Sequence, residues 1–235
     1  MERPKYFSMQ QTETSADIYI FGDITSWEWM ESDVSSYTLA RAVQALDADE
    51  ITVHINSYGG EVAEGLAIYN SLKNSRAKIR TVCDGFACSA ASVVFLAGDE
   101  RMMNPASLLM IHNAWSSASG NAAELRKAAD DLETISKTAA EAYKARINLP
   151  EEELEKLLDE ETWITPADAV AWGFATGVLD EAAAKGVNQS ARGTVYQALT
   201  GALKPREAAP HADPTPEPQP DPVPAKNSLL AMFGG

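Results

Sequence analysis

The stretch ITVHINSYGGEVAEGLAIYNSL, residues 51–72, indicates the fold class more clearly than any other part of the chain. Its first five residues are rich in β-branched side chains and predict a buried strand. The adjacent pair Gly59 and Gly60 follows, and residues 61–72 then place apolar side chains at nearly helical spacing. The sequence therefore predicts a strand, a Gly-containing turn and a helix, in that order.

The same alternation of strand and helix extends on both sides of this stretch. Further strands are predicted at residues 17–21, 79–83 and 108–111, and further helices at residues 89–97, 121–147, after Pro150 and from Thr165 to Trp172, with Gly173 as the stop. This order favours an α/β fold with largely parallel strands, in which working side chains lie at strand ends. The apolar stripe of residues 121–147 is narrow, which predicts a helix that projects or faces a partner.

Composition sets limits on what the chain does. Its 235 residues and 45% hydrophobic content predict one folded domain of roughly 150–200 residues with an appendage. The net charge of −15 argues against nucleic acid or an anionic membrane surface as the main partner. No apolar segment is long enough to span a membrane, and the first residues show no signal peptide. We expect a cytoplasmic protein in which Cys83 and Cys88 are reduced.

Proline marks the domain boundary. Eight of the twelve prolines fall between Pro205 and Pro224, a composition that forms neither a helix nor a sheet ladder. The predicted organisation is an N-terminal extension at 1–15, a folded domain at 16–181, a C-terminal helical extension at 182–204, a Pro-rich disordered linker at 205–226 and a short apolar terminal peptide at 227–235.

Three histidines limit the choice of a general base. His211 lies in the predicted linker, and His54 lies in mid-strand, where a structural role is favoured. His112 ends a predicted strand, so it is the candidate base. Ser89 follows a Gly-containing segment and begins a predicted helix, whose free amides can polarise a carbonyl oxygen.

Three blocks together resemble the ClpP-type serine proteases: INSYGGEVAEGLAIYNSL, GFACSAASVVFLAG and LLMIHNAW, in that order. The resemblance implies the ClpP/crotonase-like fold of repeated ββα units with a projecting long helix. It also implies Ser89 as nucleophile, His112 as base, and the amides of Gly59 and Ala90 as oxyanion donors, with Gly60 in the same substrate-binding turn. Tyr58 departs from the pattern, since the Clp subunits usually have proline there.

The third catalytic position has more than one candidate in the sequence. The Clp subunits carry an aspartate there, and counting back from the VAWG segment places Glu161 at this position. Either carboxylate can orient an imidazole, and Asp159 and Glu160 are close enough in sequence to be rivals.

Within this family, Tyr58 and the closing segment DEETWITPADAVAWGFATGVLD look most like the phage or prophage head-maturation proteases. The expected enzyme is a serine endopeptidase that needs no ATP by itself and cleaves scaffold or capsid precursors in the host cytoplasm or assembling prohead. Two alternatives remain: a generic Clp-type proteolytic subunit served by an ATP-dependent unfoldase, and a non-catalytic or crotonase-fold assembly protein.

The resemblance also implies partners. We expect a ring-like homo-oligomer, such as a heptamer or a double ring, and a portal, capsid or unfoldase partner. The sequence contains no P-loop pattern and suggests no metal and no other cofactor.

Overall fold

The computed structural model describes residues 9–11, 14–30 and 32–179. The linker and terminal peptide predicted after residue 204, with His211, lie outside the described residues, as does the extension predicted at 182–204. The strands are β1 (Met9–Gln11), β2 (Ser15–Ile20), β3 (Glu50–Ser57), β4 (Lys78–Cys88), β5 (Glu100–Met103), β6 (Leu108–Ile111), β7 (Thr162–Ile164) and β8 (Gly177–Val178). The helices are α1 (Ser36–Ala45), α2 (Val62–Lys73), α3 (Ala90–Phe95), α4 (Ala122–Lys144), α5 (Glu151–Asp159) and α6 (Pro166–Trp172).

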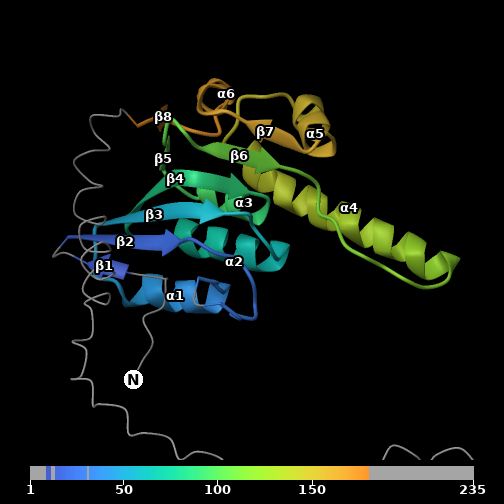
Figure 1. Ribbon diagram of the computed structural model, residues 1–235, viewed down its shortest axis with the longest axis horizontal. Coiled ribbons are helices and arrows are strands. Elements are labelled where there is room, and N and C mark those ends of the chain that lie inside the picture. The colour runs from blue at the N-terminus through green and yellow to red at the C-terminus, as the bar shows by residue number, and fades with distance from the viewer. Residues whose placement is uncertain (1–8, 12–13, 31, 180–235) are drawn as a thin grey trace, which may run out of the picture. The chain divides into compact units, whose positions relative to one another are not determined.

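The predicted α/β architecture is confirmed. The sheet runs in the order β1-β2-β3-β4-β5-β8, and β6 and β7 continue it from the far end of β4. All the pairings between β2, β3, β4, β5, β6 and β8 are parallel, whereas β1 pairs with β2, and β7 with β6, in antiparallel fashion. Helices α1, α2 and α3 lie together on one side of β2–β4 (Figure 1). Alternate residues of β2 and β3 point into that layer and are buried.

Strand β4 is longer than the sequence analysis predicted. The sequence predicts a strand that ends at Cys83 and is followed by a Gly-containing turn. The observed strand continues to Cys88. Its first half pairs with β5 and its last three residues pair with β6, so the backbone groups of the supposed turn find partners in the sheet. The turn is thereby confined to Ser89, which precedes α3 and is not helical.

Five elements were not predicted: β1, α1, β5, β7 and β8. Four of them are strands of two to four residues, too short to show a period. Strand β1 lies inside the segment that the sequence analysis treats as an extension, and the sheet therefore begins before residue 16.

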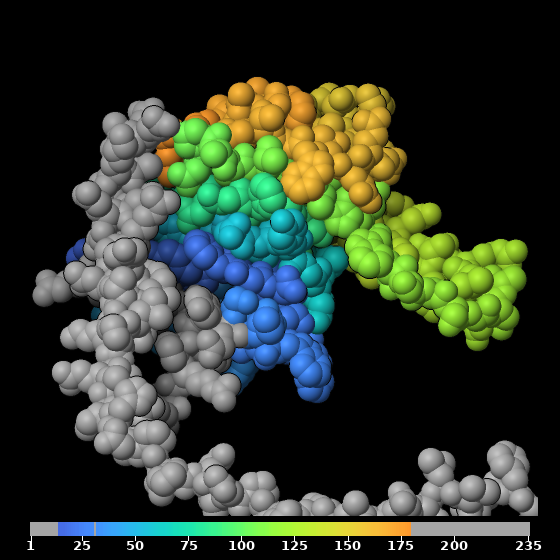
Figure 2. Space-filling model, in the orientation of Figure 1, coloured from blue at the N-terminus to red at the C-terminus, as the bar shows by residue number. Residues whose placement is uncertain are grey.

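The long helix α4 was predicted and projects beyond the sheet and its helices (Figures 1 and 2). Asn121 and Glu124 form a capping box at its start. Only its last turns are buried, at Ala140, Ala142 and Tyr143, where they pack into the core. The segment before the helix is tied to it by a hydrogen bond from the Ala114 amide to Ser136 Oγ, at 3.0 Å.

Candidate active site

Ser89 occupies the sharp turn between β4 and α3. Its φ of 54° lies in the left-handed region, which costs a non-glycine residue about 1–3 kcal/mol and is common at working sites. The Ser89 amide donates to the Met110 carbonyl at 2.8 Å, which holds the turn against β6. The serine side chain caps no helix amide, so its hydroxyl is available for another partner.

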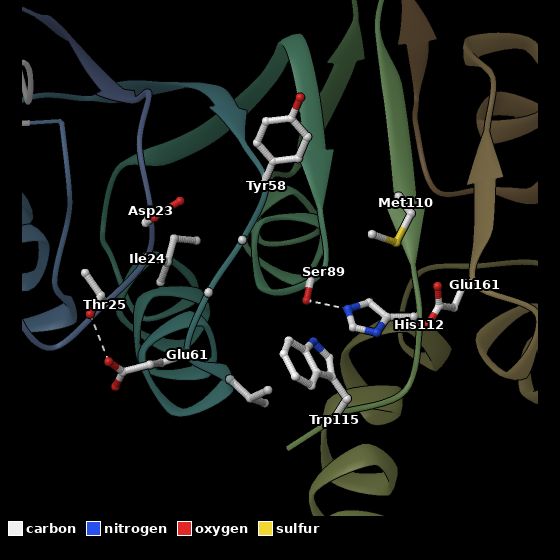
Figure 3. Close-up of a pocket in the computed structure, with 13 residues that line it drawn as sticks. Asp23, Ile24, Thr25, Tyr58, Glu61, Ser89, Met110, His112, Trp115 and Glu161 are labelled. Atoms are coloured by element: carbon white, nitrogen blue, oxygen red, sulfur yellow. Dashed lines mark hydrogen bonds between the residues drawn. The ribbon is translucent and has the colours of Figure 1, made fainter. Parts of the chain in front are cut away.

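That partner is His112. The residue lies just beyond the end of β6, and its Nε2 is 2.8 Å from Ser89 Oγ, as the dashed line in Figure 3 marks. Met110 and His112 are two residues apart, so the backbone bond from Ser89 to Met110 sets the distance between the hydroxyl and the imidazole. The two side chains that the sequence analysis named as nucleophile and base are thus brought into hydrogen-bond contact.

The pair opens into a cleft of about 730 Å³. Its other walls come from the segment after β2, the turn after β3, strand β6, Trp115 and Glu161. Figure 3 shows Glu161 on the side of the imidazole that faces away from Ser89, and the Trp115 ring below the pair. The cleft is therefore large enough for a peptide segment and has the Ser89 hydroxyl on its surface.

Of the three rival carboxylates, Glu161 alone lines this cleft. It follows the end of α5 and has a φ of 50°, the second positive φ at a non-glycine residue in the described part of the chain. Asp159 instead accepts a hydrogen bond from Asn113 Nδ2 at 2.7 Å, and Glu160 is the C-cap of α5. Backbone position thus favours Glu161 as the carboxylate beside His112.

The glycine pair lies directly against the nucleophile's turn. A Cβ at Gly59 would lie 2.5 Å from the Cys88 carbonyl oxygen and 2.8 Å from the Ser89 Cβ, so only glycine allows this approach. The Gly59 amide, expected as an oxyanion donor, donates to Ser57 Oγ at 3.0 Å. Gly60 forms a parallel β-bridge with Ile24, in which Ile24 bonds to the backbone groups of the residues on either side of Gly60. The Gly60 N–H therefore points away from Ile24. Gly60 is therefore the better candidate donor.

Glu61 fixes one rim of the cleft. Its Oε1 accepts hydrogen bonds from Thr25 Oγ1, from the Ser26 amide and from Ser26 Oγ at 2.9–3.1 Å. These bonds lower the pKa of the Glu61 carboxyl below its usual value, so it stays ionised. The segment after β2 is thereby tied to the start of α2.

His54 is not among the residues that line the cleft, and it makes the local contacts expected of a structural residue. Its Nδ1 is 2.8 Å from Asp84 Oδ2, and its ring stacks on Tyr19 with a centroid separation of 4.7 Å. Both cysteines are free and buried, as expected. Burial raises the pKa of Cys83 to about 12 and that of Cys88 to about 11, so both remain neutral thiols.

Several cleft residues escaped the sequence analysis. Asp23, Ile24 and Thr25 reach the cleft only because β2 lies beside β3. The sequence does carry a signal for Trp115 as a cleft residue, since it is an aromatic residue three positions after the candidate base. Within the described residues, no group of His, Cys, Asp or Glu is arranged to hold a metal ion. In the same residues, no helix has the length and apolar character that crossing a membrane requires.

Comparisons with known proteins show similarity to the Clp proteases. The Clp protease family matches residues 8–182. The ATP-dependent Clp protease proteolytic subunit of Deinococcus radiodurans is 34% identical over 134 residues, which is 56% of this chain and 66% of that protein, just under two thirds of its length. The subunit of the same name from Porphyromonas gingivalis is 29% identical over 163 residues, which is 65% of this chain and 73% of that protein.

Proposed function

This chain belongs to the Clp protease family, whose members are serine endopeptidases with the ClpP/crotonase-like fold, and from that premise we propose that it hydrolyses peptide bonds with Ser89 as nucleophile and His112 as general base. One observation carries the proposal: the 2.8 Å contact between His112 Nε2 and Ser89 Oγ, at a serine held with a positive φ.

The chemistry follows from this contact. As Ser89 Oγ attacks the scissile carbonyl carbon, His112 Nε2 takes the hydroxyl proton, and the carbonyl oxygen becomes an oxyanion. The imidazolium then gives that proton to the leaving amine, the C–N bond breaks, and an acyl ester of Ser89 remains. Water, deprotonated by the same nitrogen, hydrolyses the ester and restores the free serine.

The oxyanion needs two donors about 3 Å away. We assign them to the amides of Gly60 and Ala90. The first amide points away from Ile24, and the second begins α3 directly after the nucleophile. Gly59 serves by its small size, because it lets the turn after β3 lie against Ser89.

Glu161 is the proposed third member. A carboxylate beside the Nδ1–H of His112 fixes the tautomer that leaves Nε2 free to accept a proton, and it stabilises the imidazolium. Its place in the cleft on the far side of the imidazole supports this role over Asp159 and Glu160.

An active-site-directed fluorophosphonate tests the proposal. We expect it to add one covalent label per chain at Ser89, located by peptide mass spectrometry, and we expect labelling and peptide hydrolysis to disappear together in Ser89→Ala. Ser26→Ala is the matched control, since its hydroxyl lies on the cleft rim without a histidine partner. Wild-type protein that cleaves peptides without labelling, or Ser89→Ala at near-normal turnover, would refute the assignment.

For the cellular role we propose a Clp-type proteolytic subunit that receives substrates from an ATP-dependent unfoldase in the cytoplasm. The names of the two relatives support this role. The more specific expectation of a phage head-maturation protease acting on capsid or scaffold precursors has no support from the comparisons.

The proposed assembly is a ring-like homo-oligomer in which α4 contacts another subunit. Leu125 and Ile135 on its apolar stripe remain 44% and 40% exposed, and Leu132 is half-buried. We expect Leu132→Asp with Ile135→Asp to yield smaller particles in multi-angle light scattering and to lower peptidase activity. Lys137→Asp, on the exposed face, is the control. A monomeric yet fully active wild-type protein would contradict the proposal.

A further inference from the structure

Three aromatic side chains from three different elements form a row beside the cleft. Tyr58 follows β3, Phe86 lies in β4 and Trp163 lies in β7. The Tyr58 and Phe86 ring centroids are 5.6 Å apart with an interplanar angle of 72°, and those of Phe86 and Trp163 are 5.6 Å apart at 68°. Both contacts are edge-to-face, a favourable arrangement for aromatic pairs. We call these three residues the aromatic row.

The strand register explains why the row lies on one face of the sheet. Phe86 pairs with Leu108, and Trp163 lies directly opposite Met110, so the four side chains point the same way. The alternate residue Ala87 points to the opposite face and is buried in the core with α3.

The row is exposed although it is apolar. Tyr58 is 68% and Trp163 is 50% exposed, and Phe86 is half-buried. No helix among the described residues covers this face, because α1, α2 and α3 lie on the other side of β2–β4 (Figure 1). Grouped, exposed aromatic rings mark binding surfaces more often than isolated ones do.

The row is continuous with the catalytic cleft. Tyr58 lines the cleft together with Ser89, and Met110, the strand partner of Trp163, lines it as well. Figure 3 shows the Tyr58 ring at the edge of the cleft, above Ser89. A peptide that places a carbonyl at Ser89 advances about 3.3 Å per residue, so a side chain a few positions away reaches the row.

The chemistry of the row selects the side chain that it can hold. Its surface consists of three aromatic rings, and the Phe86 amide donates to an uncharged acceptor, Asn56 Oδ1, at 3.2 Å. An apolar or aromatic side chain would bury its own surface and that of the rings, whereas a charged one would lose hydration without a partner.

We propose that the aromatic row is a substrate subsite that binds one apolar or aromatic side chain of the peptide near the scissile bond. The proposal rests on the proposed function, since it needs hydrolysis at Ser89. It assigns to Phe86 and Trp163 a role in specificity and none in the bond-breaking steps.

Quenched-fluorescence peptides test this subsite. A single Phe is moved stepwise through a Ser/Ala background, and kcat/KM is measured for the full-length protein at each position. We expect one position at which Phe raises kcat/KM by about tenfold or more over Ser, because a large apolar side chain leaves water there. In Trp163→Ala and in Phe86→Ala this ratio should fall below about threefold. Trp29→Ala is the matched control, since this tryptophan is 84% exposed and outside the cleft.

The outcomes separate the subsite from the proposed function. Fluorophosphonate labelling of Ser89 reports whether each variant keeps its catalytic pair, and if Trp163→Ala loses labelling, Trp163→Leu replaces it in the comparison. Equal kcat/KM for Phe and Ser at every position in wild type would overturn the subsite, and so would a preference that persists in both row variants. Wild-type protein that neither labels nor cleaves any peptide would instead overturn the proposed function.

Discussion

Tyr143 connects the base of the projecting helix α4 to the turn that carries the proposed nucleophile. Its hydroxyl lies 2.7 Å from Ser92 Oγ, and Ser92 Oγ donates to the Ser89 carbonyl at 2.6 Å. Because the serine hydroxyl has a single proton, Tyr143 must be the donor between the two hydroxyls. Burial raises the pKa of Tyr143 to about 12, so the phenol keeps its proton at neutral pH.

The expected losses of stability follow from burial, since Tyr143 is 2% and Ser92 is 1% exposed. Tyr143→Phe leaves the Ser92 oxygen short of one donor, so we expect a loss of about 1–2 kcal/mol in the free energy of unfolding. Ser92→Ala removes the bond to Ser89 and leaves the Tyr143 hydroxyl unpaired, a loss of about 2–3 kcal/mol. In the double variant no orphaned hydroxyl remains, so its loss should not exceed that of Ser92→Ala.

Urea unfolding at fixed protein concentration measures these losses, and the rate of fluorophosphonate labelling measures the effect on the site. We expect labelling to slow by about threefold to tenfold in Tyr143→Phe, because the strained Ser89 backbone loses part of its support. Tyr37→Phe, the same change at a tyrosine that is 69% exposed, should leave both quantities within error. Additive losses in the double variant, or an unchanged labelling rate, would refute this reasoning.

Three further variants or reactions test other parts of the site. Glu161→Gln should lower kcat at least about 100-fold in a steady-state peptidase assay, whereas Glu160→Gln should stay within about twofold; equal effects would remove Glu161 from the triad. Gly60→Ala should lower the melting temperature and abolish labelling, since the φ of Gly60 is 144° and the new Cβ would lie 2.1 Å from the Ile24 carbonyl oxygen; normal labelling and stability would contradict this close approach. Cys83 and Cys88 should resist iodoacetamide at pH 8, because burial keeps both thiols protonated, and should react after unfolding. Rapid alkylation of the native protein would contradict their burial.

The predicted elements that the structure confirms are those with a strong local signal. The helix predicted at 121–147 is observed over 23 residues, and Gly173, predicted as a helix stop, has the left-handed φ of 87° that such a stop requires. The end of β4 carries no such signal. Residues 84–88 read locally as a turn, but the last three of them pair with β6, some twenty residues later, and the strand therefore continues to Cys88.

For the candidate site, the predicted strand ends and helix starts made Ser89 and His112 candidates, and the resemblance to the ClpP-type serine proteases selected them as nucleophile and base. The sequence could not determine which amide of the glycine pair points into the cleft, because that depends on the bridge from Gly60 to Ile24, some 36 positions away. Counting back from the VAWG segment favoured Glu161 without excluding Asp159, and the tertiary structure adds that Glu161 lines the cleft whereas Asp159 bonds to Asn113.

The sequence by itself therefore determined the α/β class, the order of the main elements and the chemistry available at Ser89 and His112, because these depend on local periodicity and on side-chain type. The tertiary structure alone decided the 2.8 Å contact between the two side chains, the hydrogen bonds that join Tyr143 to the Ser89 turn, and the row of aromatic rings beside the cleft. Each of these joins residues from different strands or helices, and their distance is set by strand register and helix packing, which a linear pattern does not encode.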